Sequence, residues 1–153
     1  MVICKLDDFD YWVDISVVSD DGLNAFSPLF IYIVYWAYSE NLLSHDLLNE
    51  VSFIKSLSNL QSDGSSFADF VNNELDGKLC DSYFDDSVRQ FVSDYFEFNG
   101  YTKDLAKCFK LNLWELPNSL EKANEMNELI NKSLKNYRKN LTLNPDIIDF
   151  SSN

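Results

Sequence analysis

The sequence predicts an all-α fold: a compact single-domain helical bundle of about six helices, preceded by an irregular acidic N-terminal arm. The chain has 153 residues, the usual size of one domain. It contains only 4 Gly and 3 Pro, which favours long helices over a turn-rich β-sandwich. Apolar residues make up 46% of the chain and recur at the three-to-four spacing of amphipathic helices.

The first half of the chain carries two clear helix starts. Ser27-Pro28 predicts a helix from Pro28 to about Leu43, because serine caps free N–H groups and proline fits the first helical position. This segment is apolar nearly all round, so we place it centrally in the core. Ser44 is expected to cap a second helix, from His45 to about Leu60.

Glycines and capping residues divide the middle of the chain. A short third helix is expected after Ser65 or Ser66, ending at Asp76-Gly77. A fourth runs from about Asp85 to Phe98 and is closed by Gly100. Thr102 is expected to cap a short fifth helix.

The two ends of the chain differ in character. Asn118 and Glu121 resemble a capping box, which predicts a last helix from Ser119 to about Asn140. Residues 1–22 read as the acidic arm and residues 142–153 as a loose tail. No repeat or linker divides the chain, so residues 1–153 are expected to form one domain.

Charge is the strongest functional signal. The chain carries 25 acidic and 12 basic residues, a net charge of −13 with histidine neutral. Residues 1–100 hold 18 of the acids and 4 of the bases, whereas residues 101–153 hold 7 acids and 8 bases. Such a field repels nucleic acid and anionic membranes and attracts basic proteins. We therefore expect a protein partner.

The compartment follows from cysteine usage and hydropathy. The apolar run from Leu29 to Tyr38 is too short for a bilayer span of about 20 residues, and no signal peptide is evident. Cys4, Cys80 and Cys108 lack the paired spacing of a disulfide framework or a zinc site. We expect a soluble protein of the reducing cytoplasm, without metal or cofactor.

Two acidic patches are candidate partner-binding sites. Aromatic residues accompany both, and aromatic anchors beside charges are typical of recognition surfaces. The same acids would equally keep the protein soluble. The candidates are Asp8, Asp10, Trp12 and Asp14 in the arm, and Asp76, Asp81, Asp85 and Asp86 in the middle of the chain.

Catalytic alternatives are weaker. The aspartates from Asp7 to Asp14 supply carboxylates of the kind that bind magnesium, so a metal-dependent hydrolase is an alternative hypothesis. No glycine-rich phosphate loop accompanies them. The single histidine, His45, and the basic side chains between Lys132 and Lys139 are expected on solvated surfaces. We expect a binding protein and not an enzyme.

A series of landmarks resembles an uncharacterised bacterial domain family. Its order runs from an Asp-Asp start through a Trp-Ala helix and an Asp-Gly-Lys-Leu turn to a tyrosine-rich stretch, over roughly residues 5–140. The matching residues are Asp7, Asp8 and Trp12; Trp36 and Ala37; Asp76, Gly77, Lys78 and Leu79; and Tyr95, Phe96, Gly100, Tyr101 and Asp104. Val13 stands where that family usually has histidine, so a function tied to the histidine is not carried over.

Members of that family resemble immunity proteins of contact-dependent growth inhibition and related polymorphic toxin systems. The resemblance implies a cytoplasmic protein that binds the C-terminal domain of a cognate toxin. Many such toxins are nucleases with basic clefts, and we expect a ribonuclease that cleaves tRNA, occluded at its substrate cleft. The charge argument independently points the same way. An acidic nucleic-acid mimic that inhibits a DNA-binding protein is the remaining alternative and differs only in its partner.

Overall fold

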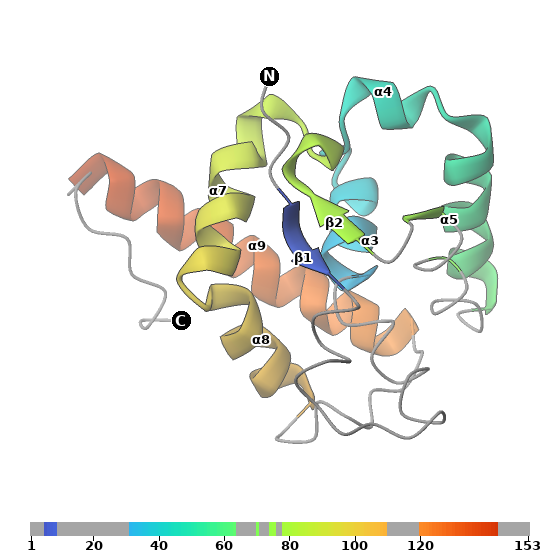
Figure 1. The fold of residues 1–153 in the computed structure, drawn as a ribbon. Coiled ribbons are helices and arrows are strands. Elements are labelled where there is room, and N and C mark those ends of the chain that lie inside the picture. Colours follow the sequence, from blue (N-terminus) through green and yellow to red (C-terminus); the bar gives the residue numbers. More distant parts are fainter. Residues whose placement is uncertain are drawn as a thin grey trace.

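A computed structural model describes residues 5–8, 31–63, 70, 74–75, 78–109 and 120–143. Within these ranges helices predominate beside one small sheet, so the predicted all-α class is confirmed (Figure 1). None of the helices in these ranges combines the length and apolarity that crossing a bilayer requires. The helices are α3 (Ile31–Ser39), α4 (His45–Leu48), α5 (Val51–Asp63), α7 (Asp86–Glu97), α8 (Gly100–Phe109) and α9 (Leu120–Leu143).

Helix α3 is the centre of the core, as its apolar composition predicted. Its residues from Ile31 to Ala37 are all buried. It packs against α9, the long helix that crosses behind α7 and the sheet in Figure 1. The helix ends at Ser39, earlier than the predicted Leu43, and Asn41 follows with a left-handed φ of 57°. Asparagine tolerates this region better than most residues.

The predicted second helix is two helices, so the prediction of one element from His45 to Leu60 is wrong. Ser44 caps α4 as expected, accepting from the Leu47 N–H at 3.4 Å. Short-range bonds then end α4, with the Glu50 N–H donating to the Leu47 carbonyl at 3.0 Å. The Glu50 carbonyl begins α5, accepting from the Ile54 N–H at 3.0 Å. Asn49 lies at the break, and asparagine disfavours helix interiors.

A small antiparallel sheet corrects the prediction of a wholly irregular arm. Strand β1 (Lys5–Asp8) pairs with β2 (Lys78–Cys80), and Lys5 lies opposite Cys80 while Asp8 lies opposite Lys78. The backbone groups of this strand find their hydrogen-bond partners in a segment far away in the sequence. No local pattern in residues 5–8 therefore predicted the strand. The 3₁₀ helix η1 (Asp81–Tyr83) follows β2 directly.

Helix α7 begins where the sequence indicated, because Asp85 caps it. The predicted closure by Gly100 is wrong, since Gly100 is the first residue of α8. The reversal falls instead on Asn99, whose φ is 63° and whose carbonyl accepts from the Lys103 N–H at 3.0 Å. The predicted cap at Thr102 is therefore also wrong, because Thr102 lies inside α8.

Helix α9 confirms the predicted last helix and runs further. It reaches Leu143, so Thr142 and Leu143 are helical and not part of a loose tail. The rest of the predicted tail, most of the acidic arm, the Asn118 cap and the starts of the first and third predicted helices lie outside the described residues. Phe70 and Leu75, assigned to the third helix, are buried.

Aromatic rings join α3, α7 and α9. Phe91 lies 6.0 Å from the Trp36 ring and 5.4 Å from the Tyr137 ring, both edge-on, and stacks on Tyr95 at 5.0 Å. Such pairs are each worth about 0.5–1.5 kcal/mol beyond the area they bury. The buried hydrophobic residues form one core cluster across the described helices.

We predict that Asn99→Ala lowers the free energy of unfolding by about 1 kcal/mol. The left-handed backbone conformation is less favourable for alanine than for asparagine. Asn99→Gly is expected to leave stability unchanged or slightly higher. Urea denaturation followed by circular dichroism measures both. Equal destabilisation by the two variants would show that the side chain matters, and not the backbone conformation.

Candidate functional site

Asp104 is a buried carboxylate that links three helices. On α8 and 1% exposed, it accepts from the Tyr95 hydroxyl of α7 at 2.5 Å and from the Ser133 hydroxyl of α9 at 2.6 Å. The Lys107 ammonium lies 3.7 Å from its other oxygen. Buried carboxylates require such partners, because desolvation of an unpaired charge costs several kcal/mol.

Asp94 repeats this arrangement on α7. It is 5% exposed and accepts from the Tyr137 hydroxyl of α9 at 2.7 Å and from the Gln90 amide at 3.0 Å. Burial, reinforced by the adjacent carboxylates, raises the pKa values of Tyr95 and Tyr137 well above the ordinary tyrosine value. Both hydroxyls therefore stay protonated and keep donating. The network therefore joins α7, α8 and α9 through bonds from hydroxyl groups to buried carboxylates.

Three of the predicted site residues lie in the short stretch formed by η1 and the start of α7, a region we call the acidic end (Asp81, Asp85 and Asp86). Asp85 accepts from the Ser87 hydroxyl at 2.6 Å and from the Ser87 N–H at 3.0 Å. These bonds lower the pKa of Asp85, so it stays charged into the acid range. Asp86, 87% exposed, pairs with Arg89 one turn along at 2.9 Å.

The sheet pairs a strand from the predicted N-terminal patch with the strand that precedes Asp81. Asp8 stands in β1 opposite Lys78 of β2, and Asp81 begins the turn directly after β2. Because Lys5, and not Asp8, lies opposite Cys80, Asp8 and Asp81 lie at opposite ends of this sheet. Of the remaining predicted residues, Asp10, Trp12, Asp14 and Asp76 lie outside the described part of the chain, and Asp8 is described only as strand backbone.

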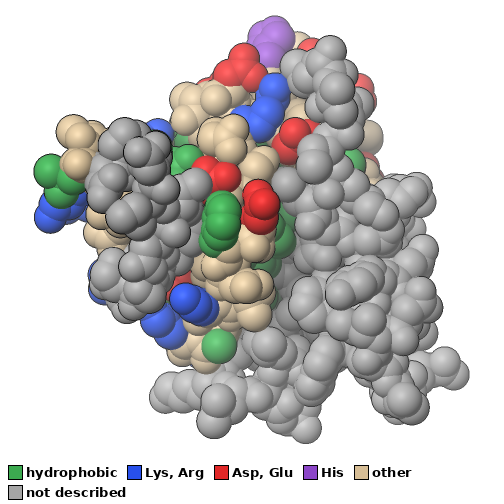
Figure 2. Space-filling view, turned by 60° about the vertical axis from the view of Figure 1, so that its left-hand side comes forward, with side chains coloured by type: hydrophobic (Ala, Val, Ile, Leu, Met, Phe, Trp, Pro, Cys, Tyr) green, Lys and Arg blue, Asp and Glu red, His purple; other side chains and the backbone are tan. Residues whose placement is uncertain are grey.

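The loop after α3 completes this region. The Ser44 N–H donates to the Tyr83 carbonyl and the Asp85 N–H donates to the Leu42 carbonyl, both at 2.8 Å. His45 and Asp46, which follow Ser44, are exposed, as predicted for His45. Figure 2 shows acidic side chains on the same face as the histidine, near the top of the molecule. Across the described residues, no group of His, Cys, Asp or Glu side chains is arranged to hold a metal ion.

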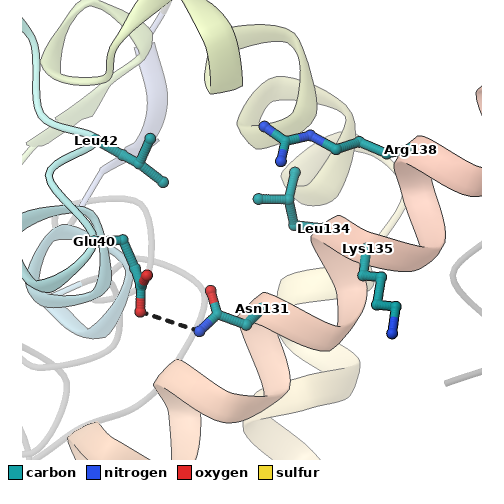
Figure 3. A pocket seen from close by; sticks show the side chains of 6 residues that line it. All are labelled: Glu40, Leu42, Asn131, Leu134, Lys135 and Arg138. Carbon is teal, nitrogen blue, oxygen red and sulfur yellow. Dashed lines mark hydrogen bonds between the residues drawn. The ribbon is translucent and has the colours of Figure 1, made fainter.

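A groove of about 450 Å³ lies beside the acidic end, between the loop after α3 and the second half of α9 (Figure 3). The groove was not predicted from the sequence, because it forms only where these two elements meet. One signal was present: Lys135 and Arg138 have no acidic residue three or four positions away on their helix. The lining residues are Glu40, Leu42, Asn131, Leu134, Lys135 and Arg138.

Cys108 is a buried thiol without reactive character. It is 4% exposed and lies 3.5 Å from a Glu125 carboxylate oxygen. Burial, together with that carboxylate, raises the pKa of Cys108 to about 12. The thiolate, which is the nucleophilic form, is therefore scarce at neutral pH. Cys80 and Cys108 are both free thiols.

Many of the residues that carry the family resemblance lie in the core. Trp36, Ala37, Leu79, Tyr95, Tyr101 and Asp104 are all buried. Tyr95 and Asp104 contact each other directly in the network. These buried landmarks therefore contribute to the fold.

A family model described as "Domain of unknown function (DUF7832)" matches residues 7–119. The matched range includes α3, α7 and α8 and stops just before α9, which supplies Ser133 and Tyr137 to the buried network. No curated protein and no solved structure shows detectable similarity to the chain.

We predict that Ser133→Ala lowers the free energy of unfolding by about 1–2 kcal/mol, because the buried Asp104 carboxylate loses a donor. Ser58→Ala is the matched control, since Ser58 is exposed inside α5 and the change in helix propensity is the same. Chemical denaturation measures both variants. A Ser133→Ala protein as stable as Ser58→Ala would show that the network contributes nothing.

We also predict an order of cysteine reactivity. In a Cys4→Ser background at pH 8, iodoacetamide should modify the half-buried Cys80 first, and Cys108 only after denaturation. Mass spectrometry of the labelled peptides reads the order. Labelling of Cys108 at the rate of Cys80 in the native protein would contradict the raised pKa and the burial.

Proposed function

The chain belongs to the DUF7832 family of domains of unknown function, and we propose that it acts by binding a basic partner protein. In its specific form, the proposal is an immunity protein of the cytoplasm that neutralises a toxin domain, a ribonuclease, by covering its substrate cleft. The observation that supports this proposal is the acidic end. There Asp81 begins η1 while Asp85 and Asp86 begin α7, on a chain with a net charge of −13.

The geometry of the acidic end favours recognition. Asp85 is held in place by Ser87, and Asp86 projects almost fully into solvent. In the pair between Asp86 and Arg89 the carboxylate is 87% exposed and the guanidinium is 22% exposed, so the carboxylate remains open to an external cation. Fixed, exposed carboxylates raise the rate of encounter with a positive surface.

Catalysis has less support. The strongly shifted pKa values are all raised, away from neutrality, so these groups stay protonated: Tyr32, Tyr95, Tyr137 and Cys108. A general acid or base works best with a pKa near the operating pH. The shifts in this chain therefore fit a packed interior better than an active site.

Occlusion is the mechanism that follows from this surface. A nuclease cleft is basic because its substrate is a polyanion. Carboxylates of the acidic end would occupy the positions of phosphate groups, and the partner's affinity for nucleic acid would fall by competition. An acidic mimic directed at a DNA-binding protein would use the same surface, and the identity of the partner separates the two.

The test uses the protein encoded beside this chain, co-expressed and purified with it. The variant Asp81→Asn, Asp85→Asn, Asp86→Asn removes three charges while asparagine preserves the helix cap. We predict that association at low salt slows about 3–10-fold, and that the difference shrinks at high salt. Stopped-flow mixing measures the rates.

The matched control removes three exposed charges elsewhere. Glu97→Gln, Glu121→Gln and Glu128→Gln change the net charge equally but lie away from the start of α7. Its association rate should fall much less. Equal rates for the two triple variants would remove the acidic end from the interface. A ribonuclease assay with each variant then reports inhibition directly.

A further inference from the structure

The groove and the acidic end form one continuous face. The Leu42 carbonyl, at the groove, accepts from the N–H of Asp85 at 2.8 Å, and Ser44 bonds to Tyr83 in the same ladder. A backbone bridge between Leu43 and Phe84 holds the two segments together. The segment that lines the groove is therefore bonded directly to the segment that leads into the acidic end.

The groove presents positive charge on its α9 wall. Lys135 and Arg138 are exposed, and neither forms an ion pair within the described part of the chain. Lys122 on the same helix is different, because it pairs with Glu125 at 3.0 Å. In Figure 3 the Arg138 guanidinium reaches over Leu134 toward Leu42, whereas Lys135 points away from the groove. Arg138 is thus the cation directed at an occupant.

The opposite wall is anchored to the core. The Glu40 carboxylate accepts from the Asn131 amide at 3.1 Å, and the Asn131 oxygen accepts from the Trp36 indole at 2.8 Å. Trp36 is fully buried, so this chain of bonds fixes Asn131 in one orientation. Leu42 and Leu134 give the groove apolar surface between the two walls.

The shape of the groove identifies the kind of occupant. Four of its six lining residues are exposed, so a small molecule would be left largely in solvent. Small-ligand sites usually bury 70–90% of the ligand. A protein segment, held by contacts elsewhere, has no such requirement. Arginine in turn prefers carboxylate, which it can bind through two parallel hydrogen bonds.

We propose that the groove receives an acidic side chain, flanked by apolar residues, from an extended segment of the partner protein. This inference rests on the proposed function for the partner's identity. The face is then bipolar, because the acidic end meets the partner's basic surface while Arg138 meets its carboxylate. A bipolar face fixes the orientation of the partner, which a uniformly acidic face cannot do.

A peptide titration tests the groove without any knowledge of the partner. The probes are acetyl-Leu-Glu-Leu-amide and its glutamine counterpart, added to ¹⁵N-labelled full-length protein. We predict saturable NMR shifts of the Asn131 side-chain amide and the Trp36 indole N–H, with at least about 5-fold weaker binding of the glutamine peptide. Arg138→Ala should abolish the difference, and Lys139→Ala, the adjacent exposed cation outside the groove, should not.

The absence of shifts, or equal shifts from both peptides, would overturn the inference. A second arm uses the co-purified partner: Arg138→Glu should weaken its binding at least about 10-fold and Lys139→Glu much less. If the partner binds Arg138→Glu as tightly as the wild type, the groove inference fails while the proposed function stands. If no partner binds but the peptide result holds, the proposed function fails and the groove remains an acidic-peptide site.

Discussion

The burial of Asp104 is the constraint on which the rest of the structure depends. A carboxylate that is 1% exposed persists only with donors in place, and these come from Tyr95 on α7 and Ser133 on α9. Three helices are therefore held in one register from the α8 side, while Phe91 and Trp36 lock α7 to α3. This frame fixes the position of the start of α7, where the acidic end lies, and of the α9 surface that forms the groove.

Groups in the interior stabilise the fold, whereas groups on the surface carry exposed charge. This difference favours the proposal of a binding protein. Inside, the titratable groups are paired and the pKa values of Tyr95, Tyr137 and Cys108 are raised, so they hold protons and shape. Outside, Asp86 and Arg138 are exposed and carry opposite charges. A rigid frame that presents fixed charges loses little conformational entropy when a partner binds.

Helices with their own caps and periodicity were predictable, and contacts between distant segments were not. Asp85 and the apolar stripe of α7 indicated that helix within a residue, whereas the β1–β2 pairing depends on segments with no shared local signal. Gly100 was misjudged because Asn99 takes the left-handed position usually given to glycine. Among site residues, Asp81, Asp85 and Asp86 do gather, but the groove needs the loop after α3 to meet α9, which periodicity does not reveal.

Hydrogen exchange of the full chain, alone and in complex with the product of the neighbouring gene, tests the central claim most directly. The first N–H groups of a helix lack intrahelical partners, so amides at the start of α7 report sensitively on what covers them. The bipolar face predicts slowed exchange there and in the loop after α3, with α5 and α8 unchanged. Protection confined to α5 or α8, with the start of α7 exchanging as in the free protein, would contradict it.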